Sequence, residues 1–166
     1  MFKPQNSSKT SITLRDVQPS DLPIFFEQQR DPLAVHMAAF TAKEPANRAA
    51  FDAFWARISA NPTVTIRTID FEGQVAGSVL KYDDEGHPEV SYWLGREFWG
   101  KGIATLALRQ FLQVVTARPI YARAASDNFG SIRVLEKCGF RLVSESTGFA
   151  NARGGEIPEV LMVLDT

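Results

Sequence analysis

Two turns in this sequence carry the residue types that could do chemistry. The first is the glycine-rich segment 95–105, GREFWGKGIAT, and an apolar helical pattern follows it. Glycines at the start of a helix leave consecutive N–H groups uncovered, with the positive end of the helix dipole behind them. This segment therefore predicts a site for a phosphate or pyrophosphate group. The alternative is that Gly95, Gly100 and Gly102 only form a tight turn.

Two common phosphate-binding signatures match this segment incompletely. Gly95 to Lys101 reads G-x-x-x-x-G-K, as in a P-loop, but Gly102 stands where a Ser or Thr should bind Mg²⁺. The dinucleotide pattern G-x-G-x-x-G fails because Thr105 takes the place of its third glycine. Nucleotide binding through the near P-loop stays open as an alternative, which ATP·Mg²⁺ can test.

The second turn lies one strand and one helix later, in segment 128–140, NFGSIRVLEKCGF. Asn128 is a typical helix N-cap and Ser131 falls in the first helical turn. Gly139 suits the position after a helix C-terminus. Alone, this is ordinary helix-starting chemistry. Beside the glycine-rich turn, it places a hydroxyl and an amide near the predicted anion site.

Hydrophobic periodicity predicts the elements that position these turns. We expect one domain over residues 1–166, of α+β class and order βααβββαβαββ, with residues 1–10 flexible. The segment 31–40 is apolar but poorly periodic and predicts an irregular or part-helical connection. The predicted strands are 11–17, 63–68, 75–82, 89–94, 119–124, 140–145 and 159–164, and the helices are a short one from Leu22, 45–60, 101–116 and 127–138.

Composition narrows the classes of function. The 166 residues are 45% apolar and 22% charged, which is typical of one globular domain, and the net charge of -1 gives no global attraction to nucleic acid or anionic membrane. The single cysteine, Cys138, excludes an intramolecular disulfide, and with only two histidines an ordinary zinc site is improbable. We expect a cytoplasmic protein with no metal, no nucleic-acid partner and no membrane partner.

Residues 89–140 resemble the Gcn5-related N-acetyltransferases (GNAT), in particular the RimJ/RimL-like branch of ribosomal-protein alanine and serine acetyltransferases. That family's turn pattern, Gln/Arg-x-x-Gly-x-Gly/Ala, is matched from Glu97 to Gly102, except that Glu97 replaces Gln or Arg. The resemblance implies a mixed, mostly antiparallel sheet that splays between its fourth and fifth strands, with helices on both faces. It also implies acetyl-CoA as co-substrate, lying between those strands.

The resemblance implies a role for each residue of the site. Ser131 would protonate the departing thiolate, and Glu89 would act as general base through water. A main-chain N–H of Trp93 or Leu94 would stabilise the oxyanion. The residues implied to bind the cofactor are Trp93, Leu94, Phe98, Trp99, Gly100, Lys101, Gly102, Ile103, Ala104, Thr105, Asn128, Ser131 and Lys137, with Arg133 or Lys137 at the 3′-phosphate.

The acceptor side is less defined by the sequence. His36, Phe40 and Ser91 are the predicted acceptor contacts, and Tyr92 is either a further contact or part of the core. The acceptor is expected to be a primary amine, either a protein N-terminus or a small molecule, and the enzyme a monomer or homodimer. The alternative to an enzyme is a CoA-binding sensor or regulatory module without catalysis.

Overall fold

The structure is a computed structural model that describes residues 11–166; the segment 1–10, expected to be flexible, lies outside the described residues. The helices are α1 (Leu22–Gln29), α2 (Pro32–Ala38), α3 (Arg48–Ala60), α4 (Ile103–Val114) and α5 (Phe129–Lys137), with 3-10 turns η1 (Pro19–Asp21) and η2 (Arg96–Phe98). The strands are β1 (Ile12–Arg15), β2 (Thr65–Phe71), β3 (Gln74–Asp84), β4 (His87–Leu94), β5 (Ile120–Ala125), β6 (Arg141–Ala150) and β7 (Gly155–Leu164).

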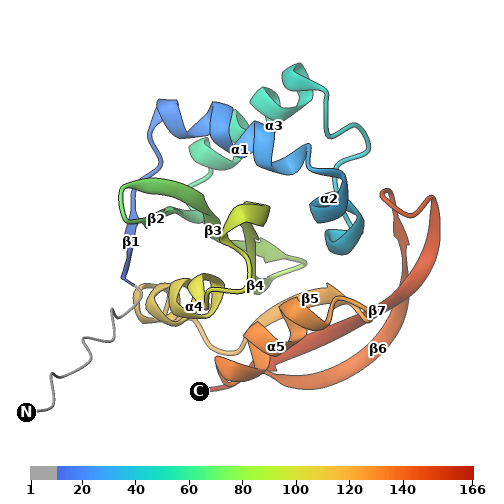
Figure 1. The fold of residues 1–166 in the computed structure, drawn as a ribbon. Coiled ribbons are helices and arrows are strands. Elements are labelled where there is room, and N and C mark those ends of the chain that lie inside the picture. The colour runs from blue at the N-terminus through green and yellow to red at the C-terminus, as the bar shows by residue number, and fades with distance from the viewer. Residues whose placement is uncertain (1–10) are drawn as a thin grey trace, which may run out of the picture.

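The strands form one sheet in the order β1-β2-β3-β4-β5-β7-β6. Every neighbouring pair is antiparallel except β4 and β5, which pair in parallel only at Glu89 and Tyr121. Helices α1 and α3 lie on one side of the sheet, and α4 and α5 lie on the other (Figure 1). The predicted α+β class is confirmed, as is the parting of the fourth and fifth strands.

Two apolar clusters hold the helices to the sheet. The larger cluster includes Ile103, Leu108 and Phe111 of α4, which recur at helical spacing and pack against strand residues such as Val79 and Ile120. The smaller cluster is aromatic and lies under α1 and α3; its buried members are Phe25, Phe26, Phe51 and Trp55. The first cluster fixes the start of α4, and the second fixes the helices on the opposite face.

The connection over residues 31–40, expected to be irregular or part-helical, contains the helix α2 and so follows the part-helical interpretation. Asp31 caps this helix by accepting hydrogen bonds from the main-chain N–H groups of Leu33 (3.0 Å) and Ala34 (3.3 Å), and Pro32 occupies its first turn. With seven residues, α2 is too short for a helical period to stand out in the sequence.

Two hairpins differ from the prediction, because their strands extend further toward the turn. The polar segment 83–88, expected to be a loop, is a two-residue turn in which Glu85 and Gly86 both have positive φ (49° and 81°), so the strands continue to Asp84 and from His87. Strands β6 and β7 extend to Ala150 and from Gly155, well beyond the predicted 140–145 and 159–164. The added stretch of β6 is largely exposed on both faces, so no alternation of apolar residues marked it.

Candidate active site

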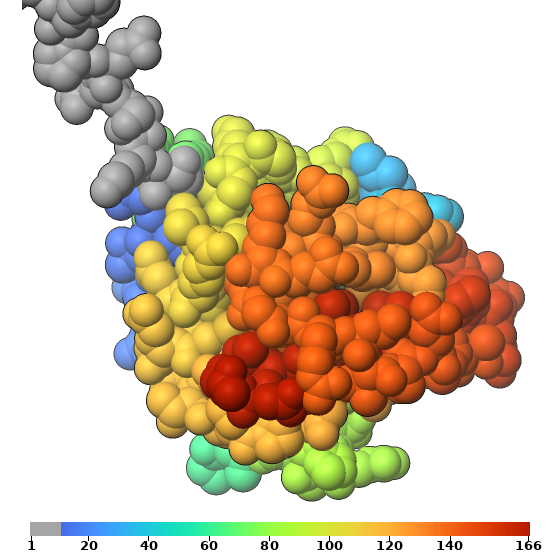
Figure 2. All heavy atoms as spheres, turned by 90° about the horizontal axis from the view of Figure 1, so that it is seen from below, coloured from blue at the N-terminus to red at the C-terminus, as the bar shows by residue number. Residues whose placement is uncertain are grey.

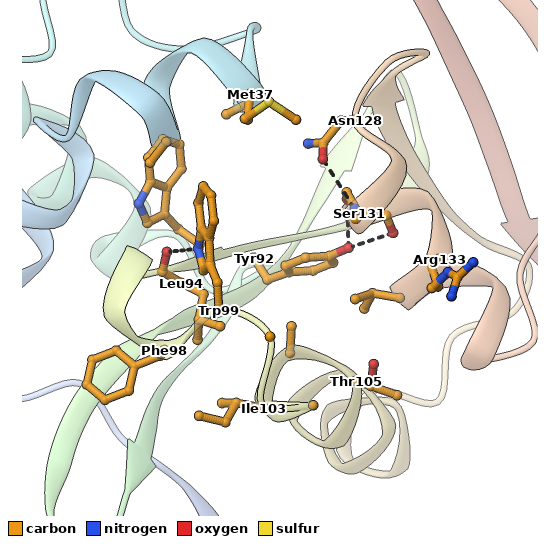
Figure 3. Close-up of a pocket in the computed structure, with 18 of the residues that line it drawn as sticks. Met37, Tyr92, Leu94, Phe98, Trp99, Ile103, Thr105, Asn128, Ser131 and Arg133 are labelled. Atoms are coloured by element: carbon orange, nitrogen blue, oxygen red, sulfur yellow. Dashed lines mark hydrogen bonds between the residues drawn. The ribbon is translucent and has the colours of Figure 1, made fainter.

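The parting of β4 from β5 opens a cavity of about 570 Å³ in the middle of the sheet. Beyond Glu89, the side of β4 that faces β5 has no strand partner in the described chain. Main-chain groups there must find other partners, because unpaired buried N–H and C=O groups are costly. Figure 3 shows this first cavity between β4, the start of α4, α5 and α2. Its lining is Ala34, Met37, Ala38, Tyr92, Trp93, Leu94, Phe98, Trp99, Gly100, Gly102, Ile103, Ala104, Thr105, Asn128, Gly130, Ser131, Arg133, Val134 and Lys137.

The glycine-rich turn forms one end of this cavity. Gly100 and Gly102 both have positive φ (73° and 75°), and a β-carbon on either would meet no atom within 4 Å. Gly102 is the N-cap of α4, and no side chain caps that helix end. The first N–H groups of a helix have no partner inside the helix. Those of Ile103, Ala104 and Thr105 are therefore free to bind an anion, as the sequence predicts.

A close approach at Gly77 sets the main chain of β4 beside the cavity. Gly77 on β3 lies opposite Leu94, and a β-carbon there would collide with the main-chain oxygen of Trp93. The oxygen and the N–H of a trans peptide point in opposite directions. The N–H of Leu94 therefore points away from β3, while the Leu94 oxygen accepts a hydrogen bond from the Trp99 indole (2.9 Å). Sequence reasoning missed Gly77, and an isolated glycine within a strand was the available signal.

A hydroxyl pair lies at the start of α5, opposite β4 (Figure 3). The Tyr92 hydroxyl and Ser131 Oγ are 2.8 Å apart, with either able to donate, and the Tyr92 hydroxyl also donates to the main-chain oxygen of Ser131 (3.2 Å). Asn128 Oδ1 accepts from the Ser131 N–H (3.2 Å), which fixes the first turn of the helix. Burial raises the pKa of Tyr92 to about 12, although its bond to Ser131 acts in the other direction. Tyr92 is therefore a neutral phenol at physiological pH.

Glu89 lies apart from the first cavity, where β4 and β5 still pair. Its Oε1 accepts from Arg123 Nε (2.9 Å) and its Oε2 accepts from the Tyr82 hydroxyl (2.8 Å). Only 3% of Glu89 is exposed, and it lines neither of the two cavities described here. Burial, followed by the bond to Glu89, raises the pKa of Tyr82. The carboxylate of Glu89 thus joins β3, β4 and β5 at the point where the sheet begins to open.

A second cavity, of about 390 Å³, opens on the α1 and α3 side of β4. Tyr92 and Trp93 line both cavities, so the two adjoin near the C-terminal end of this strand. The rest of the lining is aromatic, aliphatic and polar, with a single carboxylate: Phe25, Gln28, Gln29, Phe40, Thr41, Ala42, Glu44, Pro45, Ala50, Phe51, Phe54, Trp55, Ser78, Leu80 and Ser91.

Most residues predicted for the site lie around the two cavities. Of the residues expected to bind a cofactor, all but Lys101 line the first cavity; the Lys101 ammonium lies over the Phe71 ring, 5.8 Å from its centre. Phe40 and Ser91, expected on the acceptor side, line the second cavity. His36 lines neither and is exposed on α2, where its main-chain oxygen accepts from Arg153 Nε (2.9 Å).

Other residues of the two linings were not predicted. Ala34, Met37 and Ala38 enter the first cavity from α2, a helix that sequence periodicity did not reveal. Phe51, Phe54 and Trp55 follow a helical stripe, which predicts only that α3 buries one face.

Cys138, at the end of α5, is half-buried, and burial raises the pKa of its thiol. Within residues 11–166, no group of three His, Cys, Asp or Glu side chains is placed to bind a metal, and no helix is long and apolar enough to span a bilayer.

Comparison with known proteins relates this architecture to acetyltransferases. The model of the family described as "Acetyltransferase (GNAT) domain" matches residues 11–141. No curated protein matches the chain in sequence.

Several solved structures share the fold. RimJ from Mycobacterium smegmatis, in complex with CoA-disulfide, is 19% identical with a TM-score of 0.79, over 93% of this chain and 82% of that one. The microcin C7 self-immunity acetyltransferase MccE, with acetyl-CoA and AMP, is 21% identical with a TM-score of 0.76, over 93% and 92%. Spermidine N-acetyltransferase from Vibrio cholerae, with CoA and spermine, is 16% identical with a TM-score of 0.75, over 92% and 95%.

Proposed function

The chain belongs to the acetyltransferase (GNAT) family, and we propose that it transfers the acetyl group of acetyl-CoA to a primary amine within a ternary complex. The observation that carries this proposal is the first cavity, where the glycine-rich turn, the open edge of β4 and the Ser131 hydroxyl meet. The second cavity adjoins it at Tyr92 and Trp93, and so provides a place for the amine. Related folds have been solved with acetyl-CoA or CoA bound.

The residues of the first cavity fit the chemistry of acetyl-CoA. The free N–H groups at the start of α4 suit its pyrophosphate. The two amides of the pantetheine arm need main-chain partners, which the uncovered edge of β4 supplies. Arg133 and Lys137 bring positive charge to the same cavity for the 3′-phosphate.

In the proposed reaction, the neutral amine attacks the thioester carbon, the C–N bond forms, and the C–S bond then breaks. The Leu94 N–H would stabilise the oxyanion. The thiolate would take its proton from Ser131 Oγ, which Tyr92 orients by the 2.8 Å hydrogen bond, and Ser131 would regain a proton from water. A free thiol has a pKa of about 8.5, so its thiolate is a tolerable leaving group and one hydroxyl donor suffices.

The observed contacts of Glu89 favour a positioning role over direct proton transfer. Both of its oxygens are engaged, by Arg123 and Tyr82, and it lies outside the second cavity. We therefore assign the proton released by the amine to water in the second cavity. Glu89 would act by holding β4 at the width that the cofactor needs.

Two kinds of acceptor agree with this scheme. The RimJ/RimL-like resemblance of residues 89–140 supports a protein α-amino group, while the volume of the second cavity, about 390 Å³, supports a small amine. A CoA-binding module without catalysis is the alternative function. Its cavity would bind acetyl-CoA equally well, so only turnover separates it from an enzyme.

Two measurements test the proposal in order. Acetyl-CoA and CoA should raise the melting temperature of the protein, whereas ATP·Mg²⁺ should not; stabilisation by ATP·Mg²⁺ alone would contradict acetyl-CoA binding. A screen of amines at saturating acetyl-CoA, with detection of free thiol, should then show amine-dependent CoA release. Stabilisation by acetyl-CoA without thiol release for any amine would support the non-catalytic module.

A further inference from the structure

The second cavity carries information about the acceptor that the proposed function leaves open. Resting on that function, we propose that the acceptor is a primary amine with a single positive charge and an aromatic or bulky aliphatic substituent. Its amine would lie near Ser91 and Tyr92, next to the first cavity, and its substituent would lie among the aromatic side chains of α1 and α3. Polyamines and other polycations would be poor acceptors.

The walls of the second cavity are apolar and held in place. The Phe25 and Trp55 rings stack with centres 5.0 Å apart, and Phe51 lies 6.0 Å from Trp55. All three rings are buried and belong to one packed cluster, so the wall is preformed. Phe54 differs because it also lines the cavity but leaves 42% of its surface exposed. An apolar group bound here would cover that ring.

The second cavity contains buried polar atoms that have no protein partner. Gln28 Oε1 and Trp93 Nε1 are buried, belong to residues that line this cavity, and make no hydrogen bond within residues 11–166. Two serines lie on the floor of the cavity, of which Ser78 is buried and Ser91 is exposed. Ser78 is paired with Trp93 and Leu80 with Ser91, so the two serines are diagonal neighbours on one face of the sheet. A buried acceptor without a partner, here Gln28 Oε1, favours a ligand that donates a hydrogen bond, and an amine does so.

The charged residues around the second cavity limit how many positive charges the acceptor can carry. Glu44 is the one carboxylate among its lining residues, and Asn47 Nδ2 already donates to it (3.2 Å). The nearby carboxylates of Glu89 and Glu159 face Arg123, at 2.9 and 3.9 Å, rather than the cavity. Arg48 and Arg57 already lie over the Phe51 and Phe54 rings, 5.8 and 5.4 Å from the ring centres, so additional ammonium groups would meet like charge there without a paired anion. One ammonium is therefore accommodated, and two or three are not.

Acceptor pairs of similar length test this inference at saturating acetyl-CoA. We expect kcat/KM for 2-phenylethylamine and 3-methylbutylamine to exceed that for 1,5-diaminopentane and spermidine by about tenfold or more, since burial of one such group is worth at least that factor. Equal or better turnover of spermidine would overturn the inference and leave the acetyltransferase intact. The absence of thiol release with every amine would overturn both.

Two variants test the position of the substituent. Phe54→Ala should lower the preference for 2-phenylethylamine over 1,5-diaminopentane by about fivefold, chiefly through KM, because part of the wall is removed. Phe149→Ala is the matched control: its ring is 62% exposed on β6 and lines neither cavity, so the ratio should not change. Ser91→Asp should shift the ratio toward 1,5-diaminopentane by adding an anion to the floor. An unchanged ratio in both Phe54→Ala and Ser91→Asp would contradict the placement.

Discussion

The two cavities on either side of β4 are built from different parts of the chain. The first uses main-chain groups at a helix start and at an open strand edge, and the second uses side chains from α1, α3 and the sheet. A main-chain site tolerates changes of side chain but not changes in the path of the backbone. A side-chain site tolerates small changes in the path of the backbone but not changes of side chain. The difference explains how one protein can keep a constant co-substrate and still adapt its acceptor, and it can be tested residue by residue.

The largest effect is expected for Gly102→Val. Valine strongly disfavours the positive φ at this position, so the turn should change its path and its N–H groups should lose their convergence. Loss of such anion-stabilising donors predicts a fall in kcat/KM for acetyl-CoA of roughly a thousandfold.

Gly73→Val provides the control for this change. Gly73 has a φ of 82° and equally open surroundings, but it lies in the β2–β3 turn away from both cavities. It should lose similar stability, measured by thermal unfolding, while retaining kcat/KM. Equal losses of activity in the two variants would show that strain, rather than the amide cradle, is responsible.

Ser131→Ala should have the next largest effect and shows where a side chain matters in the first cavity. Removal of the proposed proton donor should lower kcat by about a hundredfold and leave the KM for acetyl-CoA nearly unchanged. Ser126→Ala is the control, because its buried hydroxyl has no hydrogen-bond partner within the described residues. Steady-state kinetics measures both, and a normal kcat in Ser131→Ala would remove this residue from the mechanism.

Glu89→Gln distinguishes a positioning residue from a base. Glu89 is buried but its partner Arg123 is 42% exposed, so the substitution should lower the free energy of unfolding by only about 1–2 kcal/mol in urea titrations. We expect kcat/KM to fall by about tenfold or less at every pH, since the wider gap would bind the cofactor less well. A base would behave differently: the acidic limb of the pH–rate profile would disappear in the variant.

Lys101→Ala should have the smallest effect, although Lys101 lies between the two glycines of the turn. Its ammonium is directed to the Phe71 ring and lies outside the first cavity. The KM for acetyl-CoA should therefore change by no more than about twofold, given the modest value of an exposed cation–π contact. A rise of more than tenfold would mean that the side chain binds a phosphate after all.

The difference between the cavities also decided how much the sequence could predict. The residues from Trp93 to Lys137 form most of the first cavity within one continuous stretch, and glycine spacing there constrains the backbone directly. The second cavity gathers residues from Phe25 to Trp93, and a helical stripe of aromatic residues does not reveal whether a ring packs in the core or lines a cavity. Helix α2 was predicted only as a part-helical connection, because seven residues give no clear period, and Met37 was not assigned to the site.

A single residue pair joins β4 to β5, so the seven strands form two groups, β1 to β4 and β5 to β7. The helices and the core beneath them hold the two groups together. A ligand whose amides bridge the opening would restore the continuity that the chain itself lacks. In that sense the bound substrate would be a structural component, and the protein would be most nearly a complete sheet when it is ready to react.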